Sequence, residues 1–222
     1  MRLGGPLPRE EMAAARDDPG VEEVARALMH AEQPRELLRY AMTAIAPTKS
    51  GRGAFAATFT EQLAPSDVGR LKQIQDVAAR WQSLSAEELG RRKGAVVERL
   101  VELLLGRRLD QSAVRREERV CFDDGQCTTP VDVLGIADPQ WEAIECKAGW
   151  RVDDDQGREL SFRARHAKML GERLLAVFAS AAERRTVLAS LQRLEDHDLI
   201  AFVAEDSMFS LAQAAPSEFV PA

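Results

Sequence analysis

Apolar residues recur at helical spacing in the first part of the chain and at strand spacing further on. In residues 21–46 and again in residues 66–84 they fall three or four positions apart, which predicts amphipathic helices. A shorter helix is expected over residues 55–63. Residues 1–20 are rich in glycine, proline and mixed charge, so we expect a flexible tail there. Residues 21–84 are therefore interpreted as an all-helical N-terminal region.

A more strongly marked helix is predicted over residues 85–108. Ser85 is followed three positions later by Glu88, which is the pattern of a capping box at a helix N-terminus. The last turns, AVVERLVELLLG, are apolar enough to be buried, yet they contain Glu98. A carboxylate inside an apolar helix is costly unless it has a partner or a task, so Glu98 is a candidate functional residue. Glu102, one turn further on, is the alternative.

After residue 108 the hydrophobic period changes from that of a helix to that of strands. The Asp124-Gly125 pair is a strong hairpin-turn signal between the first two strands. The pattern predicts strands at 119–122, 127–137, 141–149, 174–180 and 199–203, with helices at 160–172 and 182–194. This order predicts an α/β domain over residues 85–210, with a mixed sheet flanked by helices, and a C-terminal tail over residues 211–222.

Charged residues interrupt two of the predicted strands. Asp132 lies in PVDVLG, and Glu145 and Lys147 lie in WEAIECKA. Because side chains alternate along a strand, Glu145 and Lys147 point to one face and Cys146 to the other. The turn between the strands is short, so antiparallel pairing can bring Asp132 beside Glu145.

Two close carboxylates favour a cation between them, and oxygen ligands select Mg²⁺ or Mn²⁺. We therefore expect a metal site formed by Asp132, Glu145 and the backbone carbonyl of Cys146, with Glu98 holding a metal-bound water or a second ion. Lys147 would orient the attacking water and offset the charge that develops on a phosphate. A desolvated Lys147 that lost its proton would act instead as the base.

The distribution of charge fits an anionic ligand. The net charge is −6, but residues 91–119 and 158–185 each carry a local charge of +4, and residues 120–157 between them carry −7. Basic side chains that would contact phosphate are Arg163, Arg165, His166 and Lys168, together with Arg91 and Lys93. The alternative is that these side chains form exposed polar helix faces.

This set of residues resembles the PD-(D/E)XK phosphodiesterase superfamily, the restriction-endonuclease-like nucleases. The resemblance covers residues 85–205 and rests on Glu98, Asp132 and Glu145-Cys146-Lys147 in an αβββαβ order. One departure is that Pro130 stands two residues before Asp132 instead of adjacent to it. The resemblance implies a restriction-endonuclease-like sheet and Mg²⁺-dependent hydrolysis of nucleic acid, usually DNA, in restriction, antiviral defence or repair.

Two alternative functions stay open. One is a catalytically inactive nucleic-acid-binding or scaffold protein with the same fold, and the other is a ribonuclease gated by a partner or ligand. The helical region 21–84 would then be the surface for a second copy of the chain or a regulatory partner. No apolar run is long enough to span a membrane, and the N-terminus does not have the pattern of a secretory signal, so a cytoplasmic protein is expected.

The cysteines add little. Three are too few for a disulfide framework, although Cys121 and Cys127 bracket the hairpin turn and could face each other. The spacing of cysteine and histidine does not match a zinc site.

Overall fold

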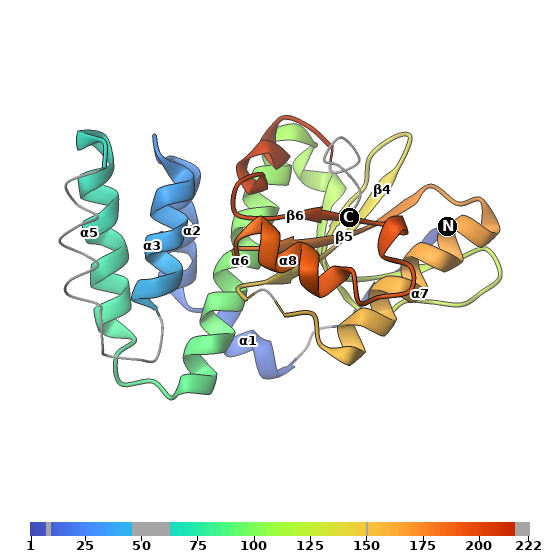
Figure 1. The fold of residues 1–222 in the computed structure, drawn as a ribbon, viewed down its shortest axis with the longest axis horizontal. Coiled ribbons are helices and arrows are strands. Elements are labelled where there is room, and N and C mark those ends of the chain that lie inside the picture. Colours follow the sequence, from blue (N-terminus) through green and yellow to red (C-terminus); the bar gives the residue numbers. More distant parts are fainter. Residues whose placement is uncertain (8–9, 46–62, 150, 216–222) are drawn as a thin grey trace.

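A six-stranded mixed sheet forms the centre of the protein (Figure 1). The computed structural model describes residues 1–7, 10–45, 63–149 and 151–215. The strands lie in sequence order, β1 to β4 antiparallel to their neighbours and β4 to β6 parallel. They are β1 (Arg2–Pro6), β2 (Val114–Cys121), β3 (Val131–Gly135), β4 (Trp141–Lys147), β5 (Leu174–Ser180) and β6 (Ile200–Val203). The predicted α/β class with a mixed sheet is confirmed.

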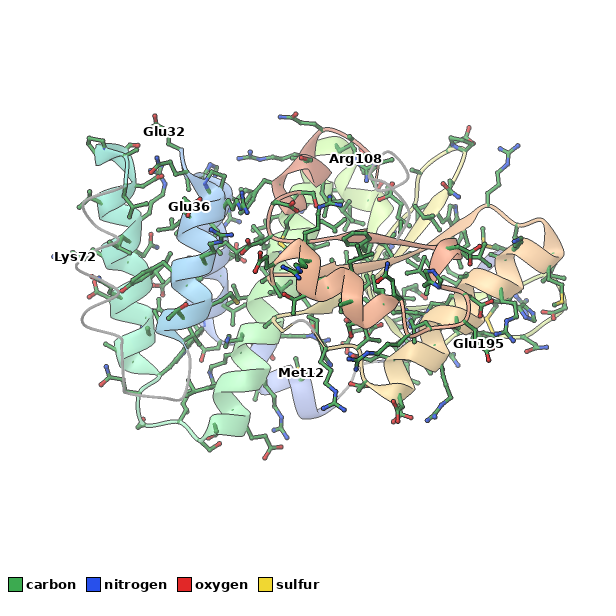
Figure 2. All side chains as sticks on the ribbon, viewed as in Figure 1. Met12, Glu32, Glu36, Lys72, Arg108 and Glu195 are labelled. Carbon is green, nitrogen blue, oxygen red and sulfur yellow. A yellow bond between two sulfur atoms is a disulfide. The ribbon has the colours of Figure 1, made fainter. Side chains whose placement is uncertain are left out.

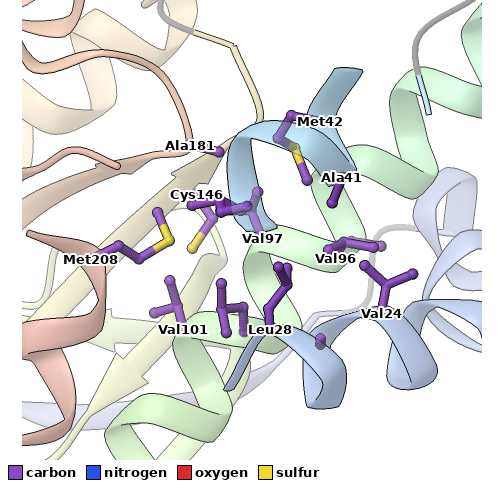
Figure 3. Packing of buried hydrophobic residues seen from close by; sticks show 14 of the residues in the cluster. Val24, Leu28, Ala41, Met42, Val96, Val97, Val101, Cys146, Ala181 and Met208 are labelled. Atoms are coloured by element: carbon purple, nitrogen blue, oxygen red, sulfur yellow. The ribbon is translucent and has the colours of Figure 1, made fainter. Parts of the chain in front are cut away.

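One face of the sheet packs on helix α6 (Ala86–Arg108). The predicted capping box is present: Ser85 Oγ accepts from the Glu88 N–H at 3.2 Å, and the Glu88 carboxylate accepts from the Ser85 N–H at 2.8 Å. Val97 and Val101 of α6 lie against Cys146 of β4 (Figure 3).

The far end of α6 is tied to the sheet by an ion pair. Arg108, labelled in Figure 2, donates to both carboxylate oxygens of Glu142 in β4, at 2.8 and 2.5 Å. Its Nε also donates to the Leu211 carbonyl at 3.1 Å. This bidentate ion pair holds the C-terminal end of α6 against the sheet and so helps to position Glu98.

The N-terminal helices form a further layer on the outer side of α6 (Figure 1). Helix α2 (Pro19–Met29) lies against α6, and α3 (Pro34–Ala44) and α5 (Pro65–Arg80) pack on α2. Their apolar residues join those of α6 and the sheet in one hydrophobic cluster. The stretch predicted as helical over 21–46 is thus two helices, and the helix predicted over 55–63 lies outside the described residues. The domain boundary at residue 84 stays a prediction.

The opposite face of the sheet is covered by α7 (Asp154–Leu170) and α8 (Arg184–Leu191) (Figure 1). Asp153 caps α7, accepting from the Gln156 N–H at 2.9 Å, and α7 ends at Gly171, whose φ of 65° is left-handed. Helix α7 begins six residues earlier than the sequence pattern predicts. Short 3₁₀ turns complete the fold: η1 (Gln111–Ala113), η2 (His197–Leu199) and η3 (Met208–Ala212).

The expectation of a flexible N-terminal tail is wrong. Residues 2–6 form β1, which pairs with the outer edge of β2, and Glu10–Arg16 form helix α1. The amine of Met1 is 2.7 Å from the Asp123 carboxylate, in the turn after β2. Composition does not reveal this strand because its stabilising hydrogen bonds are made by the backbone with a partner more than 100 residues away.

The expected C-terminal tail begins too early. Leu211 is fully buried in the cluster around α6, and η3 continues to Ala212. Residues 216–222 of that predicted tail lie outside the described residues.

Cys121 and Cys127 do face each other across the hairpin turn, where they form a disulfide. Within the part of the chain that is described, no helix is long and apolar enough to cross a membrane.

Candidate active site

An open cleft of about 420 Å³ lies between α6, the ends of β3 and β4, and the start of α7. Its walls include all four predicted catalytic residues: Glu98, Asp132, Glu145 and Lys147. Two of the predicted phosphate contacts, Arg91 and Lys93, also line it, as does Met12 of α1, labelled in Figure 2. The structure therefore gathers residues from widely separated segments into one cleft.

Asp132 is fixed to the neighbouring strand. Its Oδ2 accepts a hydrogen bond of 2.8 Å from the backbone N–H of Cys146, and the side chain is almost fully buried. Val133 pairs with Ile144 in the sheet register, so Asp132 and Glu145 follow at the next position on each strand. The predicted proximity of these two carboxylates thus follows from the antiparallel pairing of β3 and β4.

The alternation predicted for β4 is also present. Ile144 and Cys146 belong to the cluster that packs on α6, whereas Ala143 belongs to the cluster under α7. Glu145 and Lys147 lie toward α7, where each has a partner described below.

Glu98 comes from the opposite wall and is held by an arginine that the sequence reading missed. Arg16 Nε donates to Glu98 Oε2 at 2.6 Å, and Arg16 Nη1 donates to the Glu117 carboxylate of β2. The third nitrogen, Nη2, is 3.9 Å from Asp132 Oδ1. Arg16 is thus enclosed by three carboxylates. It was missed because it lies within the segment expected to be a tail.

Glu117 was missed as well. Its φ of 52° is left-handed, which is unusual for a residue other than glycine and turns the strand locally. It stands between the register pairs that Arg116 and Glu118 form with β3, and its backbone carbonyl accepts a hydrogen bond of 3.0 Å from the Leu7 N–H. No sequence pattern marks such a position in advance.

Glu145 is paired with Arg163 of α7. The Arg163 side chain is completely buried, and its Nη1 is 3.1 Å from Glu145 Oε2. Its Nη2 donates to Thr129 Oγ1 at 3.3 Å. The prediction that Arg163 contacts phosphate is therefore wrong, because this guanidinium is inside the protein and balances a buried carboxylate.

Lys147 reaches the start of α7. Its Nζ is 3.3 Å from Asp153 Oδ2, and about a third of the lysine side chain is exposed to the cleft. Partial burial opposes ionisation of Asp153, but the hydrogen bond from the Gln156 N–H and the charge of Lys147 outweigh it, so the pKa of Asp153 is lowered. The residue that caps α7 therefore also holds the ammonium of Lys147.

The pKa of the Cys146 thiol depends on its burial and on the charges around it. Burial raises the pKa of this thiol well above its usual range. Three nearby negative charges raise that pKa further: Asp132, Glu98 and Glu145. The three carboxylates thus act on the same point, and the thiol stays protonated at neutral pH. A metal at this site would take the backbone carbonyl of Cys146 as its ligand, not the sulfur.

Lys93 is the unpaired cation of the cleft. Burial lowers the pKa of its ammonium, and no described residue forms a hydrogen bond or ion pair with it. Arg91, by contrast, donates to Glu87 on its own helix. A half-buried lysine without a counter-ion among the described residues suits an anion entering the cleft from outside.

The other predicted phosphate contacts do not line this cleft. Arg165 pairs with Asp196 at 2.6 Å, and Lys168 is exposed on α7. His166 Nε2 is 2.7 Å from Asp124 Oδ2, and its ring stacks on Phe162. They lie elsewhere because α7 begins at residue 154, which places residues 163–168 in its second half instead of at its N-terminus.

The donor chemistry of the cleft fits a hard divalent cation. Asp132, Glu145 and the Cys146 carbonyl offer oxygen ligands of the kind Mg²⁺ prefers. In the present side-chain positions, however, arginines face Glu98 and Glu145, and the described residues contain no group of three His, Cys, Asp or Glu set to hold a metal ion. The residues fit the cation in chemical kind, whereas in the described side-chain positions arginines and not a metal ion balance Glu98 and Glu145.

No protein-family model and no curated protein sequence matches the chain. Among solved structures, it is similar to protein VC1899 from Vibrio cholerae, at 14% sequence identity and a TM-score of 0.46. The similarity covers 96% of this chain and 57% of that one, so the chain spans little more than half the length of that relative.

Proposed function

We propose that the protein is a metal-dependent nuclease of the restriction-endonuclease-like kind, and that it hydrolyses phosphodiester bonds in DNA. The observation that carries the proposal is the composition of one cleft. Glu98, Asp132, Glu145 and Lys147 line it together although they come from three different elements, α6, β3 and β4. A lysine that lines a cleft beside several carboxylates is a candidate functional residue.

The residues divide the chemistry between them. Asp132, Glu145 and the Cys146 carbonyl would hold Mg²⁺, with Glu98 binding through a water. The bound ion would supply Lewis-acid stabilisation of the phosphate and make a water easier to deprotonate. Lys147, held by Asp153, orients the attacking water by a hydrogen bond and offsets the negative charge that builds up on the phosphate. Lys93 binds a neighbouring phosphate of the strand.

A second candidate function is a nucleic-acid-binding protein with the same fold and no catalysis. The observation in its favour is that Arg16 and Arg163 already neutralise Glu98 and Glu145. A protein that uses these arginines only as structural partners of buried carboxylates does not need a metal. Lys147 favours the catalytic function, because its ammonium lines the same cleft as Asp132 and Glu145, whereas its pair with Asp153 fits either function.

The experiment is a cleavage panel with the full chain. Single- and double-stranded DNA and RNA are incubated with Mg²⁺ or Mn²⁺, with EDTA as the matched control. The proposal predicts cleavage of DNA that EDTA abolishes, and cleavage of RNA alone would move the assignment to a ribonuclease. If none of the substrates is cut but DNA is bound, the inactive binding protein is the better account.

A further inference from the structure

Arg16 occupies an unusual position in the candidate active site. It comes from α1, at the end of the polypeptide farthest in sequence from the sheet strands that form the cleft, and its side chain is only 8% exposed. It contacts Glu98, Glu117 and, at longer range, Asp132. One guanidinium thus neutralises a cluster in which two of the three carboxylates are expected to serve a metal.

One nitrogen of Arg16 makes no hydrogen bond in this network. Arg16 Nη2 is buried and has no hydrogen-bond acceptor among the described residues. It points toward Asp132 Oδ1, which at 3.9 Å is too far for a hydrogen bond. A buried donor left without an acceptor costs free energy, so this arrangement is stabilised by charge attraction and not by ideal hydrogen bonding.

A divalent cation and this guanidinium seek the same oxygens. A cation held by Asp132, with Glu98 binding one of its waters, would lie close to Arg16, and like charges at short distance inside a protein repel strongly. Glu117 is not among the expected metal ligands. The Arg16 side chain can therefore keep its ion pair with Glu117 when a metal ion replaces it at Glu98.

We propose that Arg16 is an internal counter-ion that competes with the divalent cation for Glu98 and Asp132, so that the docked helix α1 weakens metal binding. This inference rests on the proposed metal-dependent function. It makes α1 the element that sets the metal affinity of the site, because Arg16 leaves the carboxylates only if its side chain or its helix moves. Met12 of the same helix lines the cleft, so such a movement would also widen the site.

The test is calorimetric titration of the full chain with Mn²⁺. Arg16→Gln is expected to bind Mn²⁺ about tenfold more tightly than the wild type, which corresponds to about 1.4 kcal/mol. Arg16→Lys, which keeps the charge, is expected to bind with wild-type affinity. Arg107→Gln is the matched control, because it removes the same charge from an exposed position on α6 and should change nothing.

A folding defect would not prevent the test. If Arg16→Gln does not fold, the double variant Arg16→Gln/Glu117→Gln removes one charge of each sign and should still bind Mn²⁺ more tightly. Equal or weaker binding by the folded variants, with clear binding by the wild type, would overturn the inference and leave the nuclease proposal intact. Absence of Mn²⁺ binding in the wild type and in every variant would instead overturn the proposed function, and this inference with it.

Discussion

The Asp132 carboxylate accepts a 2.8 Å hydrogen bond from the backbone N–H of Cys146. This contact ties the acidic residue of β3 to the strand that carries Glu145 and Lys147. It engages Oδ2, while Oδ1 is the oxygen nearest Arg16. The position of Asp132 is therefore set by the sheet itself.

The first prediction separates the structural and metal-binding roles of Asp132. In Asp132→Asn the amide oxygen can still accept from the Cys146 N–H, so the fold is kept, but the negative charge is lost. We expect Mg²⁺ and Mn²⁺ to raise the unfolding temperature of the wild type and not that of the variant. Asp132→Ala leaves the buried N–H unpaired and should cost about 1–3 kcal/mol of unfolding free energy. An unchanged metal response in Asp132→Asn would contradict the assignment.

The second prediction concerns two basic residues of α7. Arg163 is buried and balances Glu145, so Arg163→Met removes the buried counter-ion of this carboxylate and should lower the free energy of unfolding by about 3–5 kcal/mol without added metal. Lys168 is exposed on the same helix, and Lys168→Ala should change stability by less than about 0.5 kcal/mol. Denaturant unfolding of both variants checks this, and similar values for the two would show that Arg163 is not a structural residue.

The third prediction is that Lys93 lowers the free energy of unfolding. Its pKa is lowered by burial, so the folded protein holds the ammonium proton less tightly than the unfolded chain does. Lys93→Met should therefore raise the unfolding free energy at pH 7, by an amount on the order of 1 kcal/mol. The gain should shrink as the pH rises through the lowered pKa of the folded state, and it should be absent above the unfolded lysine pKa of about 10.4, where neither state carries the proton.

The same variant should bind nucleic acid more weakly, because it loses the unpaired cation of the cleft. Lys72→Met is the matched control, since Lys72 is exposed on α5 and lies outside the cleft (Figure 2). Denaturant unfolding across pH and a DNA-binding titration measure the two effects. If Lys93→Met is more stable than the wild type but binds DNA with unchanged affinity, Lys93 does not contact the nucleic acid.

The fourth prediction uses the lowered pKa of Asp153. A carboxylate whose pKa is lowered on folding adds stability above its unfolded pKa of about 3.9, and this contribution is lost as the pH falls through the folded value. Asparagine caps helices as well as aspartate does, so Asp153→Asn removes the charge and keeps the cap. We expect a loss of less than about 1 kcal/mol at pH 7, because the pair with Lys147 is partly exposed, and no loss at strongly acidic pH. A difference that grows toward acid would contradict this sign.

Local signals in the sequence predicted much of the fold. The apolar run LLAVFAS corresponds to β5, Leu174–Ser180, without adjustment, and the Ser85–Glu88 pattern marks the start of α6. Both depend on neighbouring residues only. The capping pair at Asp153 and Gln156 is equally local, and it marks the start of α7 six residues before the apolar pattern does.

The remaining features depend on contacts between distant segments. Strand β1 is stabilised by pairing with β2, and Arg16 acquires its role only when α1 docks beside Glu98. Neither partner is signalled by residues nearby in sequence. The acidic residues of the cleft were predicted because each interrupts an apolar run, whereas their arginine partners lie in ordinary polar segments.

The most direct test of the account is the rate at which DNA is cleaved in Mg²⁺ by the wild type and by Lys147→Ala. The lysine is partly exposed and pairs with a carboxylate at the cleft surface, so its removal should leave the unfolding temperature nearly unchanged. The account predicts Mg²⁺-dependent cleavage by the wild type and a loss of about 100-fold or more in the variant. Equal cleavage by both proteins, or no cleavage by the wild type in either Mg²⁺ or Mn²⁺, would contradict it.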